Sequence, residues 1–163
     1  MADEGNSVAL VHDLAVLVDD VVRTVGARLP TELMMTRHQV RALADAGMGV
    51  GAHTEAHPIL AELDASEATR EIASSKTFLE RLTERPVSLF AYPNGKPGKD
   101  YTAVNVEQVR SLGFAAACST AAGSATRDSD PRQLPRFTPW GREAWKFGAR
   151  LSNNLRSGPV EVV

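Results

Sequence analysis

The sequence predicts an α/β fold in which parallel strands are joined by crossover helices. Two successive passes, over residues 36–52 and 64–92, each place an amphipathic helical pattern before a short apolar run. This order is typical of parallel sheets, because the helix carries the chain back to the edge where the next strand starts. With 163 residues and 43% hydrophobic content, the chain can bury one core of ordinary size, so a single domain is expected.

Two helices are expected before the first strand. Apolar residues recur at helical spacing over 7–25, and Gly26 follows as a stop. The second helix is expected over 36–46. It opens with the capping box Thr-Arg-His-Gln and ends before Gly47.

The third helix is expected over 64–84, with Asp64 or Ser66 as its N-cap. Its charges alternate in sign, which indicates a solvated outer face. The side chains expected on its buried side are Ala68, Ile72, Phe78, Leu79 and Leu82.

Two further helices are expected nearer the C-terminus. Asn105 is expected to cap a short helix that ends near Leu112, and a closing helix is predicted over 140–156. Trp140 and Trp145 in this last segment could stack on sugar rings or pack against the rest of the fold.

Four short apolar runs are interpreted as strands: 48–52, 87–92, 114–119 and 134–138. The first is expected to be buried. Its Gly49 and Gly51 weaken strand propensity but allow another backbone or a ligand to come close. Cys118 lies in the third run, where a buried and inert thiol is expected.

The charge balance excludes some partners. The chain has 18 Lys and Arg against 20 Asp and Glu, a net charge of -2, without a run of like charge that would mark a surface for nucleic acid or anionic membrane. No apolar stretch reaches membrane-spanning length, and the first five residues carry acid instead of the base of a secretory signal. A cytoplasmic location is expected for the chain as written. If the N-terminus is truncated, an extracytoplasmic location stays open.

The candidate functional residues are two histidines, His53 and His57, just after the first apolar run. The carboxyl ends of parallel strands are where ligands and catalytic groups collect. Pro58 disfavours a helix through His57, so the two rings are expected to converge through loop geometry. Neutral imidazole is a common zinc ligand, and two of them need a third group, usually a carboxylate. The alternative is that His53 ends a strand and His57 sits in a solvated turn.

Three motifs resemble the polysaccharide deacetylase family, the NodB-homology carbohydrate esterases. They are Gly51-Ala-His-Thr-Glu-Ala-His-Pro58, Phe90-Ala-Tyr-Pro-Asn-Gly95 and Leu134-Pro-Arg136. The resemblance covers roughly residues 29–139, with a helical segment at 1–28 before it and a C-terminal helix and tail at 140–163. It implies a partial NodB-type deformed (β/α) barrel.

The resemblance also implies a reaction, the metal-dependent hydrolysis of the N-acetyl group of a polysaccharide or oligosaccharide. His53 and His57 match the two histidines that hold the family's divalent ion, most often zinc, with cobalt or nickel as alternatives. Thr54 matches the hydroxyl residue between them, which is expected to stiffen the loop. Amide hydrolysis of this kind needs an activated water, a polarised carbonyl and a donor for the developing oxyanion.

Other positions are assigned through the same resemblance. The backbone amide of Asn94 matches the oxyanion donor of the family. Tyr92 and Pro93 match the subgroup pattern Tyr-Pro-x-Gly, and Arg136 stands in the motif that in many members ends in histidine. In the wider pattern Arg-x-Pro-x-Gly, the arginine corresponds to Ala91 here.

The family's Thr-Phe-Asp-Asp motif, which supplies a metal ligand and a base, has no match in residues 1–163. Asp19 and Asp20 are interpreted as part of a helix and His12 as a surface residue, and His38, in the first turn of the second helix, is assigned no chemistry. The chain is therefore expected to start partway into the domain, leaving an opened barrel with weak activity or none. The alternatives are a non-catalytic remnant that binds saccharide or a protein partner, and an unrelated α/β module with a structural histidine pair.

Overall fold

The computed structural model describes residues 16–17, 20–28, 33–138, 140, 143–156, 160 and 162–163. The chain divides into two compact units, Met1–Thr36 and Arg37–Val163.

In the first unit, residues 16–17 and 20–25 are helical. Gly26 follows with a φ of 62°, and the Ala27 N–H donates to the Val22 carbonyl at 3.1 Å. A left-handed residue with such a bond is a common helix end, so the predicted stop at Gly26 is confirmed. Asp20 lies in this helix and pairs with Arg23 at 2.9 Å, while Asp19, His12 and the start of the predicted helix fall outside the described residues.

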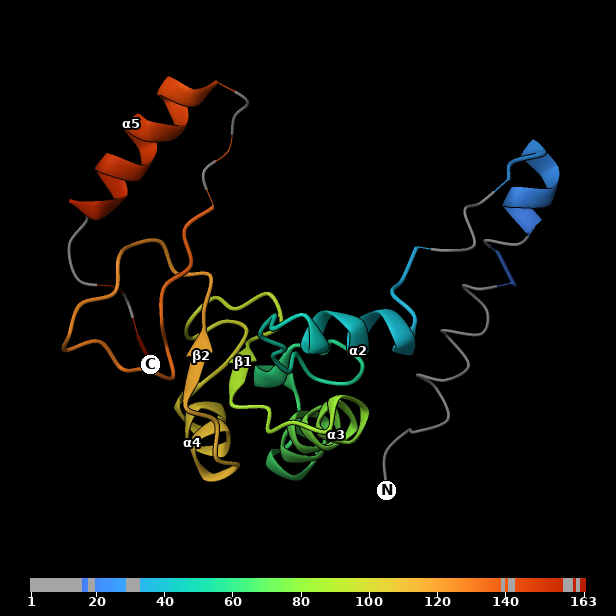
Figure 1. Ribbon diagram of the computed structural model, residues 1–163, viewed down its shortest axis with the longest axis horizontal. Coiled ribbons are helices and arrows are strands. Elements are labelled where there is room, and N and C mark those ends of the chain that lie inside the picture. The colour runs from blue at the N-terminus through green and yellow to red at the C-terminus, as the bar shows by residue number, and fades with distance from the viewer. Residues whose placement is uncertain are drawn as a thin grey trace. The chain divides into compact units, whose positions relative to one another are not determined.

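The second unit contains helices and strands in alternation (Figure 1). In chain order they are α2 (Arg37–Asp45), a short 3₁₀ helix η1 (Leu60–Glu62), α3 (Ala65–Thr83), β1 (Leu89–Ala91), α4 (Ala103–Ser111), β2 (Ala116–Cys118) and α5 (Ala144–Leu155). All of the predicted helices in this unit are present within a few residues of their expected ends.

The strands pair in parallel. β1 pairs with β2 in the register Leu89 to Ala116, Phe90 to Ala117 and Ala91 to Cys118. Single parallel bridges extend the row on both sides, from Ala52 to Phe90 and from Cys118 to Leu134. The row therefore follows chain order, with α3 and α4 as its first two crossovers, and the predicted α/β fold with parallel strands and crossover helices is confirmed.

The predicted outer strands are much shorter than expected. Of residues 48–52, only Ala52 pairs with a neighbour, and Met48 is exposed, so a buried strand over this run is wrong. Its glycines have no side chains that could pack into the core. At Gly51 a side chain would also lie 3.2 Å from the Leu89 carbonyl oxygen, which confirms the predicted close backbone approach. Of the strand predicted over 134–138, only Leu134 makes a bridge.

The crossover helices are capped by side chains. The Asp64 carboxylate accepts the N–H groups of Ser66 and Glu67 at 2.9 Å each, which confirms Asp64 as the cap of α3. The hydrogen bond from the Glu67 N–H holds the pKa of Asp64 below its usual value. The cap of α4 is Thr102, so the prediction of Asn105 is one turn too late. Asn105 instead accepts the Thr102 N–H at 2.8 Å, as the third residue of a capping box does.

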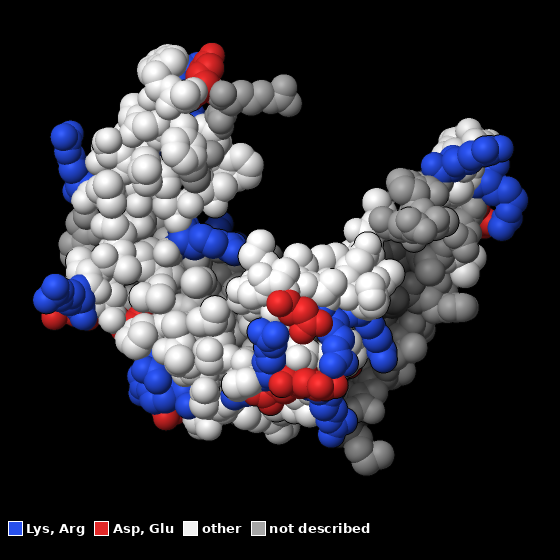
Figure 2. Space-filling model, viewed as in Figure 1, with Lys and Arg blue, Asp and Glu red and all other residues white. Residues whose placement is uncertain are grey.

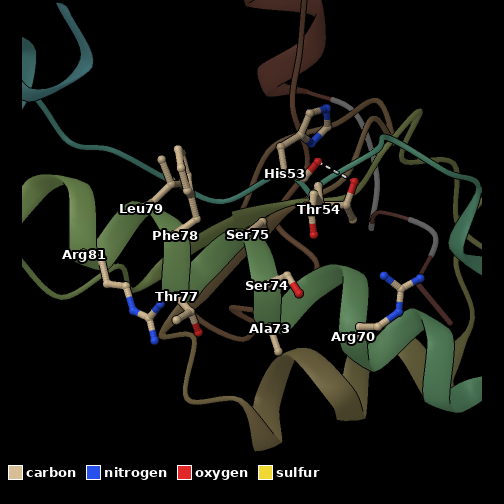
Figure 3. A pocket seen from close by; sticks show the side chains of 12 residues that line it. His53, Thr54, Arg70, Ala73, Ser74, Ser75, Thr77, Phe78, Leu79 and Arg81 are labelled. Carbon is tan, nitrogen blue, oxygen red and sulfur yellow. Dashed lines mark hydrogen bonds between the residues drawn. The ribbon is translucent and has the colours of Figure 1, made fainter. Parts of the chain in front are cut away.

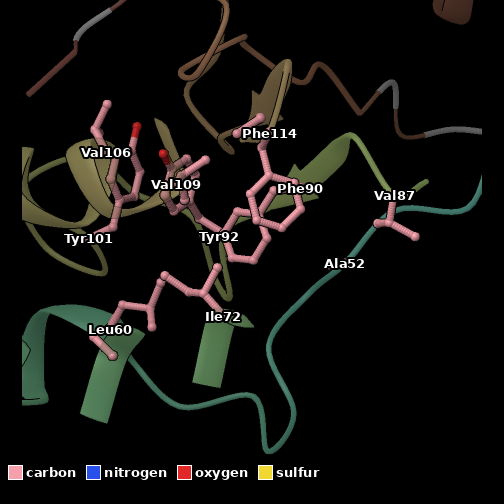
Figure 4. Packing of buried hydrophobic residues seen from close by; sticks show 12 residues of the cluster. Ala52, Leu60, Ile72, Val87, Phe90, Tyr92, Tyr101, Val106, Val109 and Phe114 are labelled. Atoms are coloured by element: carbon pink, nitrogen blue, oxygen red, sulfur yellow. The ribbon is translucent and has the colours of Figure 1, made fainter. Parts of the chain in front are cut away.

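The core lies between the strands and the two crossover helices (Figure 4). The Phe90 ring lies between those of Tyr92 and Phe114, with centroid distances of 5.2 and 5.3 Å. Tyr92 also stacks on Tyr101 at 3.9 Å, and burial raises the pKa of Tyr101 to about 12. Ile72 from α3 is fully buried in the same cluster. β1 is thus anchored through its central residue.

Two expectations about burial are wrong, those for Phe78 and Cys118. Phe78 is 46% exposed, and the Arg37 guanidinium lies 5.2 Å from the centre of its ring. Cys118 is only partly buried. In α5, Trp145 and Leu155 are exposed, as is Trp140 just before this helix, so neither tryptophan is packed away among the described residues. Helical spacing identifies an apolar stripe, but whether another element covers the stripe depends on tertiary packing.

Charges of both signs are interspersed on the face shown in Figure 2. Exposed ion pairs link α2 to the C-terminal end of α3 and to the loop after it. Arg41 and Glu84 lie 2.8 Å apart, and Arg85 and Asp45 lie 3.5 Å apart. Exposed pairs of this kind contribute little to stability. No helix among the described residues is long and apolar enough to cross a bilayer.

Asp130 lies in the loop after β2 and contacts residues of that loop and Arg110 of α4. Burial by itself would raise its pKa, but the Arg132 N–H at 2.9 Å and the Gln133 side chain at 3.0 Å donate to the carboxylate, and Arg110 lies at 4.0 Å. The net result is a pKa below the ordinary 3.8. The folded chain therefore holds this proton less tightly than the unfolded chain does, and the stabilisation is lost as the pH falls through the folded-state pKa.

We predict that the free energy of unfolding falls more between about pH 5 and about pH 3 in the wild type than in Asp130→Asn. Urea unfolding at a series of pH values measures both slopes. Asp128→Asn is the control, because it removes the same charge from an exposed position on the same loop. Equal slopes in the wild type and Asp130→Asn would contradict the prediction.

Candidate functional site

His53 and His57 lie side by side on the loop that follows Ala52. Their ring centroids are 4.8 Å apart, with the planes at 74° to each other, and both residues are exposed. The structure therefore brings the two imidazoles together through the loop, without a helix between them.

The loop between the rings has an unusual backbone. Thr54 has a φ of 61° and His57 a φ of 59°, conformations that cost a non-glycine residue about 1–3 kcal/mol each. The Thr54 hydroxyl donates to the His53 carbonyl at 2.6 Å and accepts the His57 N–H at 3.1 Å. These two bonds offset part of the strain, and they join the residues that carry the rings.

A buried carboxylate on α3 also holds this loop. Glu71 accepts the N–H groups of Glu55 at 3.0 Å and Ala56 at 2.9 Å on the same oxygen, Oε2. Sequence reasoning assigned the charges of this helix to a solvated face and missed Glu71. A signal was available: Glu71 lies three residues after Ala68 and directly before Ile72, both of which are fully buried.

The orientation of His53 follows from its contact with β1. Its Nδ1 lies 2.7 Å from the Ala91 carbonyl oxygen. A carbonyl can only accept, so Nδ1 carries the hydrogen, and in the neutral ring Nε2 then keeps its lone pair. Metal-binding histidines typically donate their second ring N–H in this way, and the bond sets the ring orientation. Ala91 stands where the family pattern has an arginine, and its backbone carbonyl orients the His53 ring.

The residues present fit a divalent ion as two of its ligands. Zinc prefers imidazole nitrogen, and catalytic zinc sites use three protein ligands with one position left for water. Among the described residues, no cluster of three His, Cys, Asp or Glu side chains is placed to hold a metal ion. The remaining coordination positions are thus not supplied by the part of the chain that the structure describes.

Asn94 lies in the turn after β1. It has a φ of 55° and is exposed, and its carbonyl accepts the Thr120 hydroxyl at 2.7 Å. The Thr120 N–H donates to the Gly95 carbonyl at 2.8 Å, so the turn is tied to the end of β2. Among the described residues, none accepts the Asn94 N–H.

The other predicted site residues have different surroundings. Tyr92 and Pro93 are fully buried, and the Tyr92 hydroxyl donates to the Arg132 carbonyl at 3.0 Å. Burial raises the pKa of Tyr92 above its usual value. Arg136 is exposed, and the described residues offer it no ion pair, so the structure does not bring it to the histidines through any contact.

A groove of about 810 Å³ runs beside the histidine loop (Figure 3). His53 and Thr54 line one wall, and α3 forms the other with Ala73, Phe78 and Leu79. His57 is not part of the lining. Phe78 lines this groove, and its ring is 46% exposed although the Arg37 guanidinium lies 5.2 Å from its centre.

Two sequence comparisons bear on identity. The family profile described as polysaccharide deacetylase matches residues 14–117. A curated protein from Bacillus subtilis (strain 168), YxkH, whose name describes it as a polysaccharide deacetylase, is 24% identical over 131 residues. That alignment covers 79% of this chain and 45% of the relative.

Solved structures show the same fold. The Streptococcus pyogenes deacetylase PplD, in complex with acetate, matches with a TM-score of 0.60 at 24% identity over 65% of this chain and 45% of its own. IcaB from Ammonifex degensii matches with a TM-score of 0.60 at 18% identity over 73% of this chain and 52% of its own. The chain thus spans about half the length of these relatives. The profile match over well more than half of the chain shows that it belongs to the polysaccharide deacetylase family.

Proposed function

We propose that this chain contributes to the metal-dependent removal of acetyl groups from an N-acetylated polysaccharide or oligosaccharide, with His53 and His57 as ligands of a divalent ion, zinc first. The observation that carries the proposal is the pairing of the two rings on one loop, 4.8 Å apart. The contact of His53 Nδ1 with the Ala91 carbonyl supports it, because this contact leaves Nε2 free to bind.

The reaction breaks the C–N bond of an acetamido group. Water adds to the carbonyl carbon, acetate leaves, and the sugar nitrogen takes up a proton. When bound, a divalent ion supplies an acidified water, with a pKa lowered from ~16 to about 7, and polarises the carbonyl.

This chain's own residues orient the reacting groups. His53 and His57 hold the ion, and Thr54 stiffens the loop between them. The Asn94 N–H donates to the oxygen that becomes negative when water adds. Removing one such donor typically lowers the rate by roughly 10²–10³-fold. Pro93 and Tyr92 support the turn from beneath, where both are buried.

The relatives agree with this chemistry. YxkH is named as a polysaccharide deacetylase, and PplD is a deacetylase whose solved structure holds acetate. Acetate is the product expected of the proposed reaction. The N-acetyl donor proposed for this chain rests on the family resemblance of its motifs.

The test compares three histidine variants. Wild type with zinc and an N-acetylglucosamine oligomer is expected to release acetate, and His53→Ala and His57→Ala are expected to lower the rate and the zinc affinity at least about tenfold. His38→Ala is the matched control, since His38 is an exposed histidine on α2. Enzymatic acetate detection and zinc competition with a coloured chelator give the two readouts. Acetate release from wild type no faster than from His53→Ala would contradict the proposal.

A second candidate function is saccharide binding without turnover. The observation that favours it is the lack of a third ligand near the histidine pair among the described residues. Calorimetry in the presence of a chelator separates the candidates: saccharide binding that persists without metal, with no acetate released in its presence, selects the binding function.

A further inference from the structure

Glu71 is a buried acid placed beneath the loop that carries the histidines. Glu71 is only 6% exposed and lies on the side of α3 that faces the core. Its Oε2 accepts two backbone N–H groups, from Glu55 and Ala56, the two residues midway between the rings. The contact joins a helix to a loop 15 and 16 residues earlier in the chain.

Core packing does not account for an acid at this position. A buried carboxylate is unfavourable unless it is hydrogen-bonded or paired, and an apolar residue would fill the same place at less cost. The only cation near Glu71 among the described residues is Arg70, whose guanidinium is 3.9 Å from Oε1 and mostly exposed. The two loop amides are therefore the main partners of this carboxylate.

The bonds to Glu71 act on the segment that sets the ring positions. Thr54 and His57 flank Glu55 and Ala56, and both have left-handed backbone conformations. Thr54 joins the ends of the segment through its hydroxyl, and Glu71 holds its middle from below. Without the carboxylate, the N–H groups of Glu55 and Ala56 would lose their acceptor, and the strained loop would be free to relax toward ordinary backbone angles.

We infer that Glu71 is the positioning residue of the His53–His57 pair: it holds the connecting loop so that both rings can bind one ion. Glu71 touches neither the ion nor the substrate, and acts through the amides of Glu55 and Ala56. The part of this role that concerns metal binding rests on the proposed function. The effect on ring geometry holds without metal.

The experiment compares Glu71→Ala with Glu71→Gln and Glu80→Ala. Both N–H groups converge on one oxygen, so the amide oxygen of glutamine can replace it and restore the loop. Glu80 is the matched control, since it is a glutamate on the same helix whose side chain accepts a backbone N–H, that of Val87 at 3.1 Å, away from the histidines. Circular dichroism and urea unfolding establish that each variant is folded.

Zinc alone is the probe for the first readout, by competition with a coloured chelator. Glu71→Ala is expected to weaken zinc binding roughly 10–100-fold, the usual effect of losing a partner that orients a ligand. Glu71→Gln is expected to recover most of this loss, and Glu80→Ala to bind like wild type. Unchanged zinc affinity in folded Glu71→Ala, or an equal loss in Glu80→Ala, would overturn the inference.

The second readout needs no metal. In wild type, nuclear Overhauser contacts between the two imidazole rings are expected from their 4.8 Å separation, and they should be lost in Glu71→Ala and kept in Glu80→Ala. Ring contacts that persist in Glu71→Ala would overturn the inference. If wild type binds no zinc, the proposed function fails, and the ring contacts alone then decide whether Glu71 positions the pair.

Discussion

Phe90→Ala is expected to lower the free energy of unfolding by about 3–5 kcal/mol, the usual cost of removing a buried aromatic ring. Phe90 is 2% exposed and contacts the rings of Tyr92 and Phe114. It is also the central residue of β1, bridged to Ala52 on one side and paired with Ala117 on the other. Domains of this size are stable by only about 5–15 kcal/mol, so the loss would remove a large part of the total.

The control for this substitution is the preceding residue of the same strand. Leu89 points to the other face of the strand pair and is 46% exposed, so Leu89→Ala is expected to cost less than about 1 kcal/mol. Urea unfolding followed by circular dichroism measures both variants. Similar losses in the two variants would show that the packing around Phe90 does not form the main core.

Gly95→Ala is expected to slow acetate release about 10²-fold, because it disturbs the turn that presents the Asn94 amide. Gly95 has a φ of 76°, and a Cβ there would lie 3.0 Å from the Thr120 nitrogen and 3.1 Å from the Tyr92 carbonyl oxygen. These two atoms belong to the backbone, which cannot move aside as a flexible side chain can, and the Thr120 Cγ2 would lie at 3.2 Å. The turn must therefore shift, and stability should fall by roughly 2 kcal/mol.

Gly98→Ala separates the two causes of this effect. Gly98 has a similar φ of 71°, but an added Cβ would meet only Val163 Cγ1 at 3.8 Å. Its expected cost is about 1–2 kcal/mol from the backbone conformation alone, with acetate release close to wild type. Steady-state rates and urea unfolding on both variants provide the comparison. A Gly95→Ala variant that keeps the full rate would count against an oxyanion role for the adjacent amide.

The helices and strands were predicted well where the cap, the apolar period and the stop all lie within the same short stretch of sequence. α3 begins after Asp64 as expected, since the cap, the helical period and the stop all lie within a single run of residues. The same holds for the position of β1 and for the parallel order of the strands. The Gly51–Pro58 motif was sufficient to select the histidine pair, because both residues lie on one loop.

Contacts between residues far apart in the sequence could not be predicted from these local signals. Asn105 is a favoured N-cap residue type, but the structure makes Thr102 the cap and Asn105 the third residue of its capping box. Phe78 matches the apolar period of α3, yet it is 46% exposed, with a guanidinium and, among the described residues, no apolar core residue against its ring. Glu71 matches the charge pattern of a solvated face, yet it bonds to the loop between the two histidines.

The amino-acid order was enough to predict the α/β class, the family resemblance and the two imidazoles, because each depends on residue types at short spacing. The folded chain alone reveals that Ala91 orients His53, that Glu71 holds the loop between the rings, and that the outer strands shrink to single bridges. These features join residues 15 to 38 positions apart through backbone groups, which every residue type carries. A sequence pattern therefore cannot distinguish them, and tertiary packing selects which of these groups meet.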